Sequence, residues 1–194
     1  AFGYSLVDGM VSQDIVRGLN VTAGAQHAAF GPRFSNDGQD VWNGRVKVRY
    51  NINSTVNIFA AETYNQAQLG LNGGIDIAAT PDSLRFDRLQ AIVRNTDAYE
   101  KSTRNDLQLG AALRLLCDTA SVSTLTAWLS SQVREFRDEE NRPSPNGIYL
   151  SQDQRSQWSG LSLQHHQAFG SAILDAAFEF QSQRVLVTPA TEED

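Results

Sequence analysis

The feature of this sequence that most constrains its fold is an alternation of apolar and polar side chains with a period of two residues. In residues 46–53, valine, tyrosine and isoleucine alternate with lysine, arginine and asparagine. Residues 107–115 and 172–181 repeat the pattern with leucine, alanine and phenylalanine on one side. Successive side chains of a β-strand point to opposite faces of a sheet, so each segment predicts a strand with one apolar and one polar face.

The connections between the alternating segments are in turn short and long. We expect about seven strands, at residues 18–30, 43–53, 55–69, 104–117, 121–136, 154–169 and 171–187. Short turns at 53–55, 118–120 and 170–171 alternate with long connections at 31–42, 70–103 and 137–153. In an up-and-down antiparallel sheet, this order gathers the long loops at one end and the short turns at the other. A soluble β-sandwich has no reason to sort its connections in this way, and its strands are usually shorter.

The first 17 residues are harder to assign. Phe2, Tyr4 and Leu6 alternate like a strand, but Asp8 and Gly9 resemble a turn. These residues therefore leave open whether the chain has an eighth strand. The count matters because about seven strands cannot close an up-and-down barrel of the usual even-stranded kind, whereas eight is the smallest common number for a closed transmembrane barrel.

The longest connection contains a helix signal. Thr80 is a typical N-cap residue, and Pro81 suits the first turn of a helix. Phe86 and Val93 then share one helical face. We predict a helix of three turns over residues 84–95, lying over the mouth of a barrel.

Composition restricts the ways in which this chain can meet a membrane or a partner. Of its 194 residues, 41% are hydrophobic and 20% charged, and no apolar run of about 18 residues occurs, so the sequence offers no transmembrane helix. Only a closed barrel would then span a bilayer. The net charge of −6 argues against a nucleic-acid partner, and the single Cys117 excludes an internal disulfide framework.

Several side chains have the character of metal ligands without the required arrangement. His165 and His166 are adjacent on a predicted strand, so their rings would point to opposite faces, and we predict no shared metal ion. His27 has no ligand partner at a recognisable spacing, and we expect it to pack against the lumen. Residues 36–40 resemble a calcium loop but lack its downstream glutamate, which favours a polar loop built on Asp-Gly.

Signals for anion binding and catalysis are equally weak. Residues 71–76 would be able to cradle an anion, but they open no helix, and we interpret them as a flexible loop. The arginine-rich run 134–142 would be able to grip a carboxylate or sugar, although such runs are more often solvated loops. No nucleophile is spaced with histidine and aspartate, and no phosphate loop precedes a helix. We therefore predict no enzyme activity and no catalytic, cofactor-binding or metal residue.

Aromatic residues fall mainly near the predicted strand ends, which is typical of the interfacial girdles of membrane barrels. A scatter of core aromatics in a soluble protein is the alternative. The residues concerned are Trp42, Tyr50, Tyr64, Tyr99, Trp128, Phe136, Tyr149, Trp158 and Phe169.

The strand–turn–strand rhythm, the glycine-rich segment at 70–76, the long loop after it and the strand after Asp97 to Lys101 together resemble the barrel of TonB-dependent outer-membrane receptors. The likeness covers residues 18–187. It implies a 22-stranded barrel with an N-terminal plug domain that imports siderophores, cobalamin or glycans. Neither a plug nor a TonB box is recognisable, the chain does not begin with Met, and it ends Thr-Glu-Glu-Asp without the terminal aromatic strand of such barrels. We expect an internal fragment of a longer receptor.

The fold class that we predict is all-β: an antiparallel up-and-down transmembrane β-barrel, partial, of about 7–8 strands, with long loops on one side and one short loop helix. Residues 1–194 form a single barrel region. Its predicted function is ligand capture and uptake in the Gram-negative outer membrane. Outer-membrane lipid, a small solute and TonB, contacted through a missing N-terminal region, are the expected partners. A complete eight-stranded barrel with a structural or adhesive role, or a secreted β-rich binding domain, is the alternative.

Overall fold

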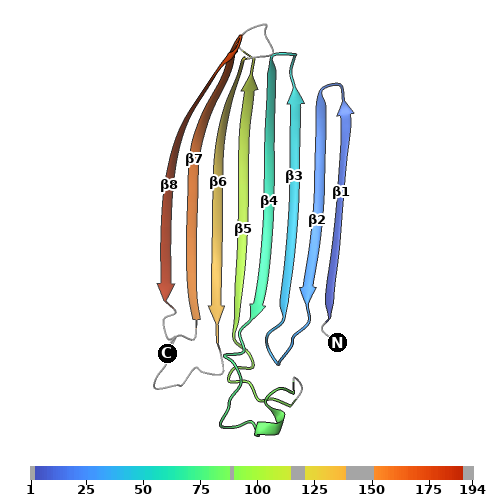
Figure 1. Ribbon diagram of the computed structural model, residues 1–194, viewed down its shortest axis with the longest axis vertical. Coiled ribbons are helices and arrows are strands. Elements are labelled where there is room, and N and C mark those ends of the chain that lie inside the picture. Colours follow the sequence, from blue (N-terminus) through green and yellow to red (C-terminus); the bar gives the residue numbers. More distant parts are fainter. Residues whose placement is uncertain (1–2, 88–89, 115–120, 139–150, 190–194) are drawn as a thin grey trace.

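The computed structural model of the protein contains one antiparallel sheet in which eight strands follow each other in sequence order (Figure 1). It describes residues 3–87, 90–114, 121–138 and 151–189. The strands are β1 (Tyr4–Val16), β2 (Leu19–Phe30), β3 (Gln39–Asn51), β4 (Val56–Gly70), β5 (Tyr99–Leu113), β6 (Ser121–Arg137), β7 (Ser151–Phe169) and β8 (Ala172–Pro189). Each pairs with its sequence neighbours, so β1 and β8 form the two edges of an open sheet.

The antiparallel up-and-down order of the strands confirms the predicted all-β class. The strands are also long, from 12 residues in β2 to 19 in β7, where about 5 to 6 is usual. The short connections at Gly18, 52–55 and Gly170 lie at one end of the sheet, and the long connections lie at the other, as predicted (Figure 1). The predicted turn at 118–120 lies outside the described residues.

β1 is the eighth strand, whose presence the sequence did not decide. The turn expected at Asp8 and Gly9 is wrong, because both residues lie inside β1 and pair with Gln26 and Ala25. The chain reverses instead at Gly18, whose φ of 85° suits glycine and whose Cα lies so near β3 that a Cβ would come within 2.7 Å of the Asn51 carbonyl oxygen. The strand count is therefore even, and the argument against closure from an odd count does not hold.

The three-turn helix predicted over 84–95 is wrong. Between β4 and β5 the described residues contain a single 3₁₀ turn, Asp82–Leu84. Thr80 caps no helix; its Oγ1 accepts a hydrogen bond of 3.0 Å from the Ile92 amide. Phe86, expected on the packing face of the helix, is 88% exposed. No helix in the described part of the chain has the length and apolar character needed to cross a membrane.

The loop between β4 and β5 adopts an extended, folded-back conformation instead. Ile75 and Val93 form an antiparallel bridge, and the amides of Asp76 and Arg94 donate to carbonyls across it. Val93 is buried together with Ala91 and Ala98, so the apolar residues of the loop form a small core of their own. In this pairing, backbone N–H and C=O groups bond across the bridge, so they are not available for the hydrogen bonds of a helix.

Asn95 ties the same loop to the end of the sheet. Its Nδ2 donates to Asp138 beyond β6 at 2.7 Å, and its Oδ1 accepts from the Ala98 amide at 2.7 Å. Asn36, from the connection between β2 and β3, donates to the Ala98 carbonyl at 2.7 Å. Segments from three connections are thus joined at the loop end of the sheet.

Candidate functional site

The register of the sheet sorts its side chains into two faces of opposite character. Paired residues of neighbouring strands point to the same side, so one face can be followed from strand to strand. Val46, for example, pairs with Ala23 in β2 and with Glu62 in β4. We call this side the apolar face, because toward the turn end it carries Val11, Val21, Val46, Val48, Tyr50, Ile58, Leu107, Leu109, Leu113, Leu125, Leu129, Leu161, Leu163, Leu174, Phe178 and Phe180.

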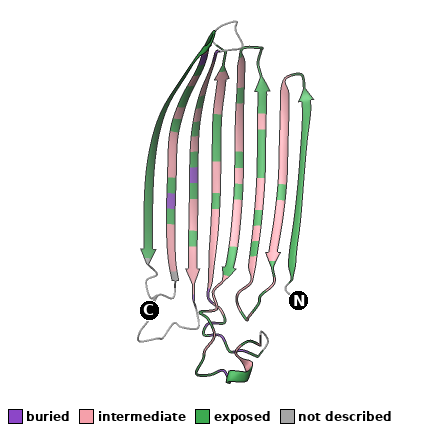
Figure 2. Cartoon of the chain, viewed as in Figure 1, coloured by how far each residue is buried: buried purple, intermediate pink, exposed green. Residues whose placement is uncertain are grey.

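The apolar face is open to the surroundings, whereas the opposite, polar face is partly shielded. Leu109 is 50% exposed and Phe178 61% exposed on the apolar face. On the polar face, Ser130 and Ser156 are only 6% and 7% exposed, and they lie in the buried segments of β6 and β7 (Figure 2). A water-soluble protein normally buries its large apolar side chains and exposes its hydroxyl groups. The distribution in this sheet is the reverse.

Charged side chains of the apolar face gather at its loop end, so that the apolar residues near the turns form a belt. Asp40, Lys101, Glu135, Arg155 and Arg184 all lie on the loop side of this belt. Glu62 lies at its border and accepts a hydrogen bond of 3.1 Å from Asn105. Apart from Glu62, the described residues of the turn-side half of the face include no Asp, Glu, Lys or Arg. Its apolar side chains are interrupted only by Gln13, Ser123, His165 and Gln167 and by small residues.

The loop-side border of this apolar belt is nearly level from β4 to β8 and lies further toward the loops on β3. On β3 it lies at Trp42, whose row of cross-strand partners reaches β8 at Leu186. On β8, however, the uninterrupted apolar run ends at Phe180, six residues earlier along the strand. On β4 the run already ends at Ala60, in the same row as Phe180, because Glu62 follows it; the six-residue step therefore lies between β3 and β4.

The polar face presents amides, hydroxyls and paired charges along the length of the strands. Its ion pairs include Arg104 with Asp106 at 2.9 Å and Arg134 with Glu100 at 2.6 Å. β1 departs from the pattern, since Leu6 and Met10 also lie on this side. Other polar residues of the face are Asn20, Thr22, Gln26, Arg45, Lys47, Arg49, Thr63, Gln108, Thr126, Gln132, Gln164, His166, Asp175, Glu179, Gln181 and Gln183.

Glycines on the polar face are covered by large side chains from the paired strand. The indole of Trp128 lies over Gly160, and the ring of Phe59 lies over Gly110, so closely that a Cβ at either glycine would collide with the ring. A glycine within a strand often marks such a close approach. These rings therefore lie down against the sheet instead of standing away from it.

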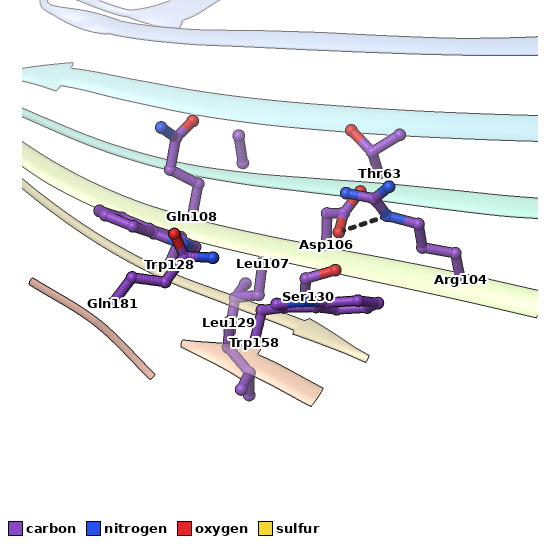
Figure 3. A pocket seen from close by; sticks show the side chains of 11 residues that line it. Thr63, Arg104, Asp106, Leu107, Gln108, Trp128, Leu129, Ser130, Trp158 and Gln181 are labelled. Carbon is purple, nitrogen blue, oxygen red and sulfur yellow. Dashed lines mark hydrogen bonds and ion pairs between the residues drawn. The ribbon is translucent and has the colours of Figure 1, made fainter. Parts of the chain in front are cut away.

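A cavity of about 400 Å³ lies on the polar face across β4 to β8 (Figure 3). Two adjacent rows of cross-strand partners form most of its wall. One row contains Gln108, Trp128, Gly160 and Gln181, and the next contains Asp106, Ser130 and Trp158. The Ser130 Oγ is buried in this wall and has no hydrogen-bond partner among the described residues.

The aromatic residues predicted to form an interfacial girdle lie on both faces of the sheet. Trp42, Tyr50 and Tyr64 lie on the apolar face, but Trp128 and Trp158 lie on the polar face and line the cavity. Assigning these two tryptophans to an interfacial girdle is wrong. Tryptophan alone does not say which face it occupies, and the surrounding alternation of polar Thr126, Ser130 and Ser156 was the signal that would have placed them.

The three histidines have separate surroundings. His165 and His166 point to opposite faces, as predicted: His165 Nδ1 lies 2.8 Å from Ser123 Oγ, and His166 Nδ1 lies 2.6 Å from Asp175 Oδ1. His27 does not pack on the polar side. Its ring stacks on Trp42 with centroids 4.1 Å apart, and its Nε2 lies 2.8 Å from Asp40, on the apolar face.

The oxygen-rich and glycine-rich loops use their polar groups internally. Asp37 accepts a hydrogen bond of 3.1 Å from the Phe34 amide, and Asp40 belongs to β3. In the segment 71–76, Asn72 Oδ1 accepts from the Gly74 amide at 3.0 Å. Among the described residues, no group of three or more histidine, cysteine or carboxylate side chains is placed to hold a metal ion.

The arginine-rich run predicted as a solvated loop begins inside a strand. Arg134 and Arg137 lie in β6, and Arg137 pairs with Asp153 of β7 at 2.8 Å. This confirms the strand predicted over 121–136 for residues 134–136, and the loop interpretation of the run is wrong for 134–137. Residues 139–142 and Tyr149 lie outside the described part of the chain, as does Cys117.

Comparisons with known proteins identify no relative: the chain matches no protein-family model, no curated protein and no solved structure.

Proposed function

We propose that this chain forms part of the wall of a Gram-negative outer-membrane β-barrel, of the TonB-dependent receptor or porin-like class, that takes up a small solute. The observation that carries the proposal is the reversed distribution of side chains, with an exposed apolar belt and a partly shielded polar face. Extended apolar surfaces of this size are rare on soluble monomers. In a bilayer, the belt would face lipid and the polar face would line a lumen.

The dimensions of the belt support this proposal. On β3 it runs from Trp42 to Tyr50, a length of about 26 Å at 3.3 Å per residue. This length is close to the apolar band of about 25 Å in known outer-membrane barrels.

The two open edges also bear on the proposal. β1 and β8 each have one paired side, and unpaired strand edges are not tolerated within a bilayer. The edges must pair either with each other or with further strands. Because the eight strands form an open sheet with β1 and β8 on opposite edges (Figure 1), we favour further strands and a larger barrel over a complete eight-stranded one.

The loop end supplies the capture surface in this proposal. Asn36 joins the connection after β2 to the folded loop after β4, and Asn95 joins that loop to Asp138 after β6, so these segments present a shaped surface at the barrel mouth. A solute would pass from these loops into a lumen lined by the polar face. Energy coupling through TonB and a plug domain would be supplied by other parts of a receptor. None of these steps requires catalysis by the residues of the sheet.

The proposal can be tested by inserting a short epitope into the full reading frame and expressing it in a Gram-negative host. An epitope after Asp82, at the loop end, should bind antibody on intact cells. A matched epitope after Ser54, in the turn between β3 and β4, should bind only after the outer membrane is permeabilised. A soluble product, or equal labelling of both sites on intact cells, would contradict the proposal.

A further inference from the structure

We propose that the cavity between Trp128 and Trp158 binds a pyranose ring of a neutral oligosaccharide. The inference rests on the proposed function, in which the polar face lines the path of the solute, and it names the chemical class of that solute. It starts from the two indoles in the cavity wall (Figure 3). The volume of about 400 Å³ lies in the range of small-molecule sites.

The first argument is the way in which the indoles are held. The Trp128 indole lies against Gly160. Only glycine leaves room for the ring at this position, because a Cβ there would collide with it. Trp158 is paired with Ser130, the next position of the same face of β6. The two rings thus come from adjacent rows of adjacent strands and offer apolar, rigid surface within an otherwise polar wall. Such surface suits a ligand with an apolar face and a polar rim, as a pyranose has.

The second argument is the unused hydrogen-bonding capacity around the indoles. Gln108 and Gln181 lie in the same row as Trp128, one on each side, and within the described part of the chain neither amide has a side-chain partner. Each amide offers both donors and an acceptor, which matches a sugar hydroxyl that also does both. Ser130 Oγ adds a buried hydroxyl group that has no partner in the part of the chain that the structure describes.

The third argument is the charge of the cavity. Its two charged residues, Arg104 and Asp106, pair with each other at 2.9 Å, so the wall carries no net charge from them. An anionic ligand would meet Asp106, and a cationic ligand would meet Arg104. A neutral ligand rich in hydroxyl groups is not repelled by either charge, and it can hydrogen-bond to either member of the pair.

The test is calorimetric titration of the purified full-length protein in detergent with maltohexaose, cellohexaose and chitohexaose. We expect at least one of these to bind, and Trp128→Ala and Trp158→Ala to weaken that binding at least about tenfold, because each removes a large aromatic surface that would stack on the sugar ring. Gln181→Leu, which keeps the size of the side chain, should weaken it several-fold. Trp42→Ala, on the apolar face, is the matched control and should leave the affinity unchanged.

The possible failures can be separated. Protein that labels correctly with the epitopes at Asp82 and Ser54 but binds none of the three sugars would overturn this inference and leave the proposed function standing. Sugar binding that survives in folded Trp128→Ala and Trp158→Ala proteins would also overturn it. Sugar binding by a protein that is not in the membrane would instead contradict the proposed function. Folding of each variant is checked by its heat-dependent mobility on a gel.

Discussion

Replacing Leu109 by arginine is expected to destabilise the membrane-inserted protein by about 2–4 kcal/mol, the cost of an arginine at the bilayer midplane in outer-membrane barrels. Leu109 lies near the middle of the apolar run of β5 and is half exposed on the apolar face. The new guanidinium would enter the hydrocarbon region without a partner, and the neighbouring Ala60 and Ala127 offer it none. Urea-dependent unfolding in lipid vesicles measures the effect.

Gln108→Arg is the matched control, because Gln108 is the next residue of β5 and points to the polar face. Its expected cost is less than about 1 kcal/mol, since a lumenal arginine stays hydrated. In a water-soluble sheet Leu109→Arg would not be the more costly variant. It would replace an exposed apolar side chain and have little effect on stability. Equal stability of the two variants in vesicles would therefore contradict the assignment of the faces.

Replacing Gly160 by alanine is expected to destabilise the protein by roughly 1–3 kcal/mol, as overpacking does in well-packed sites. The added methyl group would collide with the Trp128 indole and come within 2.6 Å of the Phe180 carbonyl oxygen. The indole must then leave its position over the glycine, which would also disturb the cavity. The unfolding free energy and the tryptophan emission spectrum measure the two effects.

Gly44→Ala serves as the control for this substitution, because a Cβ at Gly44 in β3 meets nothing within 4 Å. It should leave the stability unchanged or raise it slightly, since alanine loses less conformational freedom than glycine on folding. The double variant Gly160→Ala, Trp128→Ala should recover part of the loss, because residues in contact do not act independently. Strictly additive costs for the two changes would contradict the packing of Trp128 on Gly160.

The strands were the part of the fold that the sequence predicted best. Alternation such as that of Val46, Val48 and Tyr50 against Lys47 and Arg49 is a direct consequence of the two-residue period of a strand, and it also identifies the two faces. β1 was ambiguous because its apolar residues occupy both faces and because Asp8-Gly9 has the composition of a turn. In the structure its pairing with β2 outweighs that local preference.

The loop and the cavity were beyond prediction for a different reason. Thr80 and Pro81 favour a helix start, but the long-range bridge between Ile75 and Val93 and the small buried core of the loop prevail over local propensity. The cavity depends on register: Gln108, Trp128 and Gln181 are far apart in sequence and meet only because three strand pairings align them. No local motif marks such a row.

The most direct test of the central claim, that the apolar face contacts lipid and the polar face lines a lumen, is a spin-label scan of residues 107–112 in a Cys117→Ser background. Each position carries a single label in protein reconstituted into vesicles. We predict that the odd positions collide preferentially with lipid-soluble oxygen and the even positions with a water-soluble nickel chelate, with a period of two. Equal accessibility to the nickel chelate at all six positions would contradict the account.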